Sequence, residues 1–172
     1  MKGYVHVYTG NGKGKTTAAF GLALRAAGAG LKVFIGQFVK GKIYHEIQAI
    51  NLYIENITVR QYGIDCFIIN EPKEKDKEAA RKGLEEMKKI IASREFDLVI
   101  MDELTIALHY NLIGIGEVLS MIDSKPAEIE LIITGRYAPA GLMNHADLVT
   151  EMKEIKQDRK STRLNSSHRL RS

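Results

Sequence analysis

Cysteine is almost absent from this chain of 172 residues, which contains Cys66 and no other. A disulfide framework and a zinc site built from several cysteines are therefore excluded, and a single thiol is typical of a protein in a reducing cytoplasm. Long apolar runs are missing as well, and none approaches the roughly 20 residues that a membrane-spanning helix needs. A polar, glycine-rich segment begins within ten residues of Met1, so we expect no signal peptide. These absences predict a cytoplasmic protein that has no membrane partner.

Excess positive charge is missing from the body of the chain, although the formal net charge is +4. Residues 160–172 contain four Lys or Arg and no acid, and subtracting those four from the 25 basic residues leaves 21, which equals the number of acidic residues. Residues 157–172 have no apolar periodicity and resemble translated cloning-vector sequence, so we expect one folded domain over residues 1–156. A neutral body argues against nucleic acid as a partner, and a basic arm for nucleic acid is the alternative interpretation of the tail.

The segment that follows the strand-like residues 4–8 is the most informative one. Residues 9–17 read Thr-Gly-Asn-Gly-Lys-Gly-Lys-Thr-Thr. In a phosphate-binding loop, glycines let successive backbone N–H groups point at anionic oxygens, and the helix that begins there adds the positive end of its dipole. Lys15 would then reach the outer phosphates of a nucleotide triphosphate, and the Thr16 hydroxyl would bind the Mg²⁺ that bridges them.

This loop departs from the usual pattern at one position. The pattern G-x-x-x-x-G-K-[ST] has its first glycine where this chain has Thr9. Gly10 and Gly12 lie beside that position and can supply the backbone dihedrals that the loop needs. We therefore interpret residues 9–17 as a variant phosphate-binding loop, and the alternative is a surface turn rich in glycine and lysine.

A second motif supports a nucleotide site. Residues 97–103 read Asp-Leu-Val-Ile-Met-Asp-Glu, an apolar run that ends in Asp102 and Glu103. A buried parallel strand delivers carboxylates to its carboxyl end in this way, and phosphate-loop proteins hold their Mg²⁺ with such an acid. The alternative is a core strand followed by the solvated start of a helix.

Strands and helices alternate along residues 1–156, which predicts an α/β fold: a three-layer, P-loop NTPase-like domain with a mostly parallel sheet of about six strands. The predicted strands are residues 4–8, 32–38, 57–61, 97–103, 128–134 and 148–152, and the predicted helices are residues 15–27, 72–94, 104–112 and 115–122. Ligands of such a sheet bind beyond the carboxyl ends of its strands. We therefore expect the functional residues in the loops at residues 9–16, 37–45, 62–70, 102–105 and 135–139.

Five segments occur in the same order as in one known family. They are Tyr-Thr-Gly-Asn-Gly-Lys-Gly-Lys-Thr-Thr-Ala-Ala-Phe-Gly at residues 8–21, Gln-Phe-Val-Lys-Gly at 37–41, Asp-Glu-Leu-Thr at 102–105, Ile-Thr-Gly-Arg at 133–136 and Ala-Asp-Leu-Val-Thr-Glu-Met at 146–152. Over roughly residues 3–156 the chain resembles the ATP:cob(I)alamin adenosyltransferase family of the phosphate-loop type. The resemblance implies that residues 1–156 form a P-loop nucleotide-binding adenosyltransferase domain.

The resemblance also implies a reaction. The 5′-deoxyadenosyl group of ATP passes to the cobalt of a reduced corrinoid in adenosylcobalamin biosynthesis or salvage, and inorganic triphosphate leaves. Cobalt(I) is itself a strong nucleophile, so no Ser, Cys or His activated by a base is required. The implied substrates are ATP and the corrinoid, with Mg²⁺ as cofactor and a homodimer as the assembly. A flavoprotein reductase is left open as the electron donor.

The family motifs suggest roles for individual residues, with the nucleotide reversed relative to ordinary phosphate-loop proteins. The triphosphate would lie against Gly10, Asn11, Gly12, Lys13, Gly14, Lys15, Thr16 and Thr17. Mg²⁺ would be held by Thr16, Asp102 and Glu103, and the candidate catalytic residues are Lys15, Glu103 and Arg136. Arg136 would contact the nucleotide or the corrinoid, and a surface ion pair is the alternative for this side chain.

The residues that face the corrinoid are not assigned by the sequence. Family members carry aromatic residues after the third strand that press on the lower face of the corrinoid, where this chain has Tyr62 and Phe67. Either ring would serve, and anchoring of the loop to the core is the alternative. We expect structural or surface roles for His45 and His109, because a histidine ligand to the cobalt would oppose the transfer.

Two other classes of function compete with this one. A P-loop ATPase or nucleoside kinase would act at the terminal phosphate, and Glu103 would then position water or an acceptor hydroxyl. A nucleotide-gated binding module or a nucleic-acid motor is the second rival, and the neutral body of the chain argues against the motor.

Overall fold

A computed structural model describes residues 2–39, 41, 44–63 and 72–156 of the chain. These residues contain a six-stranded sheet whose strands are β1 (Val5–Thr9), β2 (Val33–Gln37), β3 (Ile57–Gln61), β4 (Leu98–Asp102), β5 (Glu130–Thr134) and β6 (Leu148–Glu151). The order across the sheet is β3-β2-β4-β5-β1-β6, and neighbouring strands are parallel throughout. A parallel sheet needs crossover connections, and the helices between the strands supply them.

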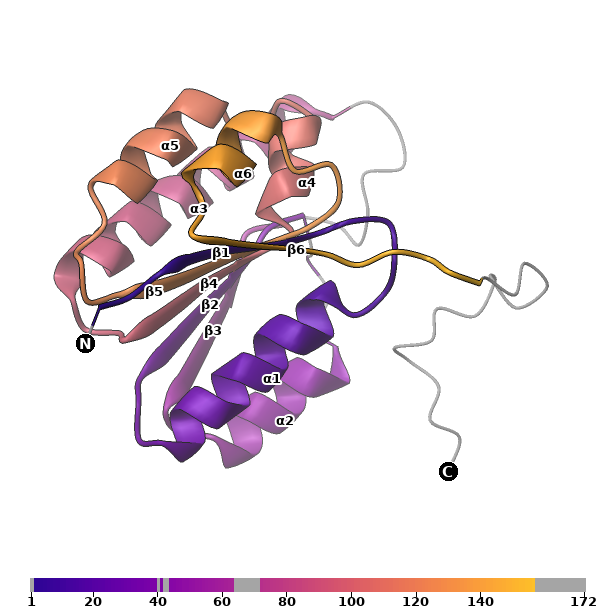
Figure 1. The fold of residues 1–172 in the computed structure, drawn as a ribbon. Helices are drawn as coiled ribbons and strands as arrows, with labels where there is room; N and C mark the ends of the chain where they lie inside the picture. Colours follow the sequence, from indigo (N-terminus) through magenta and orange to yellow (C-terminus); the bar gives the residue numbers. More distant parts are fainter. Residues whose placement is uncertain (1, 40, 42–43, 64–71, 157–172) are drawn as a thin grey trace.

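The helices cover both faces of the sheet. They are α1 (Lys15–Gly28), α2 (His45–Tyr53), α3 (Glu74–Ser93), α4 (Leu104–His109), α5 (Ile115–Asp123) and α6 (Ala140–His145). Figure 1 shows α1 and α2 on one face and the other four helices on the opposite face. The three-layer α/β fold predicted from the sequence, consistent with a P-loop NTPase-like domain, is thus confirmed.

Each face of the sheet has its own apolar core because successive side chains of a strand point to opposite faces. On the side of α1 the core contains Ile35, Ile100 and Ile132, which pack with Ala19 and Ala23 of that helix. The small alanine side chains allow α1 to lie close to the central strands. On the other side a larger core joins the sheet to the four remaining helices.

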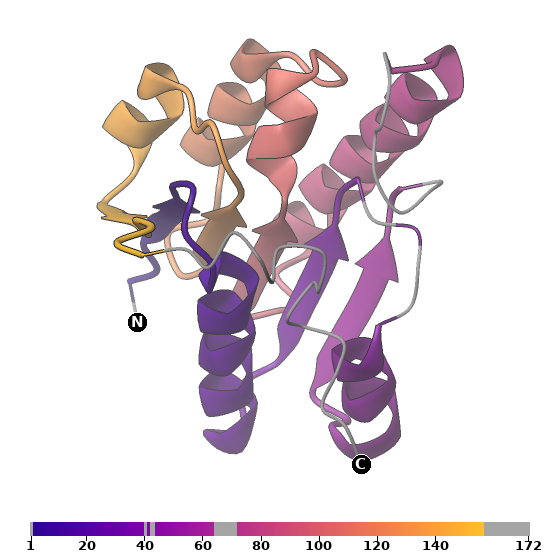
Figure 2. The same ribbon diagram turned by 90° about the vertical axis from the view of Figure 1, so that its right-hand side faces the viewer.

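The carboxyl ends of the strands lie at one edge of the sheet. Figure 2 shows the strands pointing the same way, with α1 beginning beside that edge. All five residues of β2 and of β4 are buried, so each of these strands ends in a polar side chain that is itself buried. The fold therefore brings the start of α1 and the ends of β2, β4 and β5 to one place.

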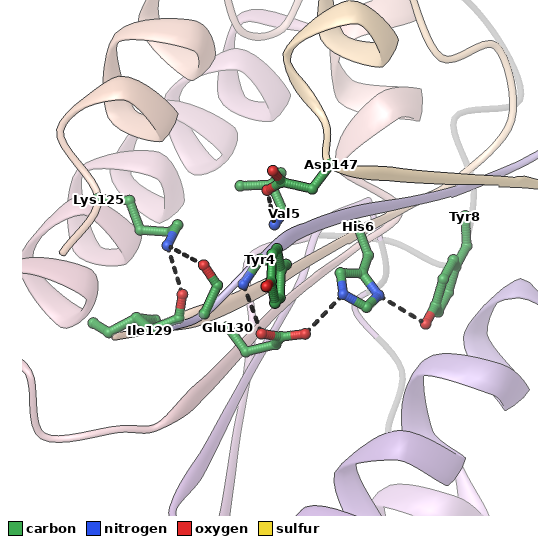
Figure 3. A network of polar contacts seen from close by, with 9 residues as sticks. Tyr4, Val5, His6, Tyr8, Lys125, Ile129, Glu130 and Asp147 are labelled. Atoms are coloured by element: carbon green, nitrogen blue, oxygen red, sulfur yellow. Dashed lines mark hydrogen bonds and ion pairs between the residues drawn. The ribbon is translucent and has the colours of Figure 1, made fainter. Parts of the chain in front are cut away.

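A polar network at the amino end of β1 joins this strand to its neighbours (Figure 3). The Glu130 carboxylate accepts a hydrogen bond from the Tyr4 backbone N–H at 2.7 Å and pairs with His6 Nε2 at 2.7 Å. The Asp147 carboxylate accepts a bond from the Val5 N–H at 2.8 Å. These contacts tie β1 to β5 and to the residue before β6, and β1 carries the glycine-rich loop at its other end.

Two helices were not predicted from the sequence. Residues 45–53 form α2 and residues 140–145 form α6, where the sequence predicted only loops and connections. Among the nine residues of α2, only Ile47 and Ile50 are buried, and among the six residues of α6, only Leu142 is buried. Such short helices have too few apolar positions for a clear period, so tertiary packing stabilises them. The predicted helix over residues 104–112 ends earlier, at His109.

Within the described ranges, no helix has the length and apolar character needed to cross a membrane.

Candidate functional site

The glycine-rich loop joins β1 to α1, as the sequence predicted. Gly14 precedes the first helical residue with a φ of 109°, and Gly10 has a φ of 99°. Both values belong to the left-handed region, where a side chain would be strained. The Lys15 ammonium turns back over the loop, because its Nζ donates hydrogen bonds to the carbonyl oxygens of Gly10 at 2.8 Å and Gly12 at 2.6 Å.

The end of β6 packs directly on this loop. The Gly12 N–H donates to the Met152 carbonyl at 2.7 Å, and the Met152 N–H donates to the Thr9 carbonyl at 2.8 Å. A Cβ added at Gly10 or at Gly12 would lie 2.4 or 2.7 Å from the Met152 carbonyl oxygen, so both positions require glycine. Thr9 needs no such freedom because it is the last residue of β1, which explains the departure from the usual loop pattern.

A side-chain hydrogen bond joins the first turn of α1 to the end of β4. Thr16 Oγ1 donates to Asp102 Oδ1 at 2.8 Å, and Thr134 Oγ1 donates to the same oxygen at 2.7 Å. The second oxygen of the carboxylate, Oδ2, accepts a bond from Gln37 Nε2 at 3.0 Å. Asp102, Thr134 and Gln37 are completely buried. A carboxylate removed from water needs such donors, since an unpaired buried charge is very costly.

Lys15 is surrounded by the other charged residues that the sequence singled out. Burial lowers the pKa of Lys15 below its ordinary value. The charges of Glu103 and Asp102 oppose this effect, with Glu103 the stronger, and the charge of Arg136 adds to it. Of the three predicted catalytic residues, Glu103 and Arg136 therefore both lie close enough to Lys15 to influence it electrostatically.

Hydrogen bonds to backbone groups hold Glu103 and Arg136 in place. Glu103 has a φ of 59°, which is unusual for a residue with a side chain, and its N–H donates to Thr134 Oγ1 at 3.0 Å. The Arg136 carbonyl accepts a hydrogen bond from Thr105 Oγ1 at 2.6 Å. The Arg136 side chain is exposed, whereas Glu103 is partly buried. Left-handed backbone at a non-glycine residue tends to occur at functional sites, because the surrounding structure must enforce it.

Oxygen ligands suitable for Mg²⁺ lie beside the loop. Mg²⁺ prefers carboxylate and hydroxyl oxygens and usually shares its shell with water and substrate phosphates. When the Thr16 hydroxyl donates its hydrogen to Asp102, its lone pairs turn away from that carboxylate, as a cation would require. No three His, Cys, Asp or Glu side chains gather into a possible metal site in the part of the chain that the structure describes. The residues present thus fit a cation that is held jointly with a nucleotide.

The remaining predicted loop residues lie between β1 and α1 or in the first turn of α1. Gly12 is buried beneath Met152. The other four are exposed to solvent: Asn11, Lys13, Gly14 and Thr17.

The aromatic and histidine candidates lie in different surroundings. The Tyr62 ring packs 5.4 Å from the Phe38 ring and fills the space that the missing side chain of Gly83 leaves, so it anchors the end of β3 to the core. Phe67 lies outside the described residues. His45 is exposed at the start of α2, and His109 stacks on the Tyr137 ring at 4.3 Å. Both histidines thus have exposed positions.

Sequence reasoning did not assign roles to Gln37 and Thr134, which the structure places on Asp102. Both are polar residues that end an apolar strand at the carboxyl edge of the sheet, and this is the same signal that singled out Asp102. That signal was available in the sequence, but it does not tell which of several strand ends lie side by side.

Comparison with known proteins identifies the family of this chain. The model of the family described as ATP:corrinoid adenosyltransferase BtuR/CobO/CobP matches residues 1–165. A corrinoid adenosyltransferase of Escherichia coli (strain K12) is 33% identical over 162 residues, which cover 90% of this chain and 79% of the relative. A corrinoid adenosyltransferase of Pseudomonas aeruginosa is 33% identical over 156 residues, covering 90% and 77% of the two chains. The chain therefore belongs to the ATP:corrinoid adenosyltransferase family.

Proposed function

We propose that this protein transfers the 5′-deoxyadenosyl group of ATP to the cobalt of a reduced corrinoid and releases triphosphate. It is a transferase by family, and the relatives named above carry the name corrinoid adenosyltransferase. The observation that carries the proposal is the contact between Thr16 at the start of α1 and Asp102 at the end of β4. This contact joins a loop suited to phosphates with a carboxylate suited to a cation.

The loop would hold the triphosphate of ATP. Residues 10–17 offer backbone N–H groups and the amino end of α1, and both favour anions. Lys15 would exchange the carbonyl oxygens of Gly10 and Gly12 for phosphate oxygens, because an ammonium interacts more strongly with an anion than with a neutral carbonyl. Holding the triphosphate in this way would fix the ribose carbon at which the bond breaks.

Charge stabilisation is the main task that the reaction leaves to the protein. A new cobalt–carbon bond forms while the bond between the 5′ carbon and the triphosphate oxygen breaks, so negative charge gathers on the leaving triphosphate. Lys15 and Arg136 would place positive charge there, and preorganised charge of this kind lowers a barrier effectively in a site with little water. Thr16, Asp102 and Glu103 would hold Mg²⁺, which supplies further positive charge to the triphosphate when bound.

The proposed transfer requires no general base. A reduced cobalt is the nucleophile, so the protein need not remove a proton from an attacking group. Near Lys15 the charges that affect it come from Glu103, Arg136, Asp102 and Glu154, and histidine is not among them. An ATPase or nucleoside kinase acting at the terminal phosphate is not favoured, because the family and its named relatives are adenosyltransferases.

The proposal is tested by anaerobic incubation of the protein with ATP, Mg²⁺ and chemically reduced cobalamin while the visible spectrum is followed. We expect conversion to a light-sensitive adenosyl product, and none in the absence of ATP. Hydrolysis of ATP to ADP without any change in the corrinoid spectrum would refute the transfer and favour the ATPase.

We extend the proposal to the setting of the enzyme. It acts in the cytoplasm as a homodimer, and a flavoprotein reductase would supply the reduced corrinoid. Residues 1–156 would form the catalytic domain, and residues 157–172 would be a vector-derived tail without a role. Removal of residues 157–172 should then leave the ATP affinity unchanged, and a truncated chain that binds ATP more weakly would contradict this assignment.

A further inference from the structure

Four polar side chains form a continuous row across the sheet at its carboxyl edge. Gln61 of β3 pairs in register with Gln37 of β2, and Gln37 pairs in register with Asp102 of β4. Thr134 of β5 lies next to Asp102 and donates to it. These residues continue the same alternation that places Ile35, Ile100 and Ile132 on the side of α1, so the row faces the start of that helix.

The hydrogen bonds of this row converge on Asp102 from both sides. A carboxylate accepts hydrogen bonds and cannot donate, so the group of Gln37 that faces Asp102 must be its NH₂. The bond from Gln37 Nε2 to Asp102 Oδ2 is 3.0 Å long. The carbonyl oxygen of Gln37 is then turned the other way and accepts a bond from Gln61 Nε2, also at 3.0 Å. The Asp102 carboxylate thus determines which way round the Gln37 amide lies, and Gln61 stabilises that orientation by donating to the Gln37 carbonyl.

This arrangement fixes the rotation of the Asp102 carboxylate. The terminal torsion of an aspartate is broad, so a carboxylate turns easily unless its oxygens are held separately. The Gln37 amide holds Oδ2, and the hydroxyls of Thr16 and Thr134 hold Oδ1. Gln37 is completely buried and does not contact the loop through any of these bonds, so it acts on the nucleotide site through Asp102.

We propose that Gln37 is a positioning residue: it holds the Asp102 carboxylate toward Thr16 and so sets the affinity of the site for Mg²⁺-bound nucleotide, with Gln61 acting one step further out. This inference rests on the proposed function of Thr16 and Asp102 as magnesium ligands. Residues that orient metal ligands from behind typically change metal affinity by about 10- to 100-fold when they are replaced.

The test compares ATP binding in the presence of Mg²⁺ with ATP binding in the presence of EDTA, by isothermal titration calorimetry on the full chain. Gln37→Met keeps the length of the side chain and removes its donor. We expect the affinity for MgATP to fall by about 10- to 100-fold, with a clearly smaller loss in EDTA. Equal losses in both conditions would show a merely structural role and would overturn the inference.

A pair of outer variants decides the question even if the Gln37→Met protein does not fold. In Gln61→Met the side-chain carbonyl of Gln37 loses the N–H group that donates to it. In Gln61→Glu the same carbonyl faces a carboxylate, and the two oxygens repel each other. The repulsion would favour a turned amide whose oxygen faces Asp102. We therefore expect Gln61→Glu to weaken MgATP binding more than Gln61→Met. An unchanged affinity for MgATP in both variants would contradict the proposed action of Gln61 on Asp102 through Gln37.

Two controls separate this inference from the proposed function. Asp102→Asn should remove the Mg²⁺-dependent part of ATP binding, and if it does not, the proposed magnesium site itself fails. If Asp102→Asn has this effect and Gln37→Met does not, the positioning role alone is refuted. Gln48→Met makes the same chemical change at an exposed position of α2 and should alter neither affinity.

Discussion

Thr16 and Asp102 are 86 positions apart in the sequence, and the Thr16 hydroxyl donates a 2.8 Å hydrogen bond to the Asp102 carboxylate. The contact exists because α1 begins beside the carboxyl edge of the sheet, at which β4 also ends. It links the part of the site that suits a triphosphate to the part that suits a cation.

Replacement of Thr16 by valine tests the link directly. Thr16→Val keeps the shape of the side chain and removes the hydroxyl from the buried Asp102. We expect the affinity for MgATP to fall by about tenfold or more, since a metal contact is lost, and the free energy of unfolding to fall by about 1–3 kcal/mol. Calorimetric titration and urea unfolding measure these two effects. Thr58→Val, at an exposed position of β3, is the matched control and should change neither.

The ammonium of Lys15 is expected to be essential for turnover. Lys15→Ala removes the positive charge nearest the loop carbonyls, so the rate of adenosyl transfer should fall by at least about 100- to 1,000-fold. The circular dichroism spectrum should remain that of the parent. Lys89→Ala, on the exposed face of α3, should retain full activity. A fully active Lys15→Ala protein would show that the loop is not the triphosphate site.

The lowered pKa of Lys15 predicts a pH dependence of ATP binding. Only the protonated ammonium attracts the triphosphate, so the affinity for ATP falls as the pH rises through the pKa of Lys15. Because burial holds this pKa below 10.5, the loss should begin at a lower pH than an ordinary lysine would give. Calorimetric titration of ATP without Mg²⁺ across the alkaline range measures it.

Glu103→Gln should move this loss of affinity to still lower pH. Glu103 is the strongest of the charges that raise the Lys15 pKa, and its neutralisation lowers the pKa further. Glu154→Gln removes a weaker charge of the same sign and should give a smaller displacement. The assigned arrangement of charges around Lys15 would be wrong if the pH at which ATP affinity is lost moved by the same amount in both variants. It would also be wrong if Glu103→Gln moved this loss to higher pH.

Two glycines in the same region should respond oppositely to alanine. At Gly10 the φ of 99° and the Met152 carbonyl leave no room for a Cβ, so Gly10→Ala should destabilise the protein by about 1–3 kcal/mol. Gly21 lies in α1 with nothing within 4 Å of an added Cβ, and Gly21→Ala should stabilise the protein by about 0.5–1 kcal/mol. Thermal melts of the two variants compare these signs. A Gly10→Ala protein as stable as the parent would mean that β6 does not pack on the loop.

Much of this site could be predicted from local sequence. Residues 10–17 and Asp102 carry their signals within a few positions, because glycines, a lysine and an acid after an apolar run each have a direct physical meaning. The alternation of strands and helices likewise predicted the α/β fold, and each of the six predicted strands overlaps an observed one.

The parts that could not be predicted depend on contacts between distant residues. The role of Gln37 follows from the position of β2 between β3 and β4, and the sequence does not state that order. The packing of Met152 on Gly10 and Gly12 requires β6 to lie beside β1. The short helices α2 and α6 lack a strong apolar period of their own and depend on the sheet for their stability.

The central claim is that the bond broken in ATP is the one between the 5′ carbon and the triphosphate. Phosphorus-31 NMR of an anaerobic reaction with Mg²⁺ and reduced cobalamin measures this most directly. The account predicts inorganic triphosphate in an amount equal to the adenosylated corrinoid formed. Formation of ADP and orthophosphate, with the corrinoid left unmodified, would contradict it.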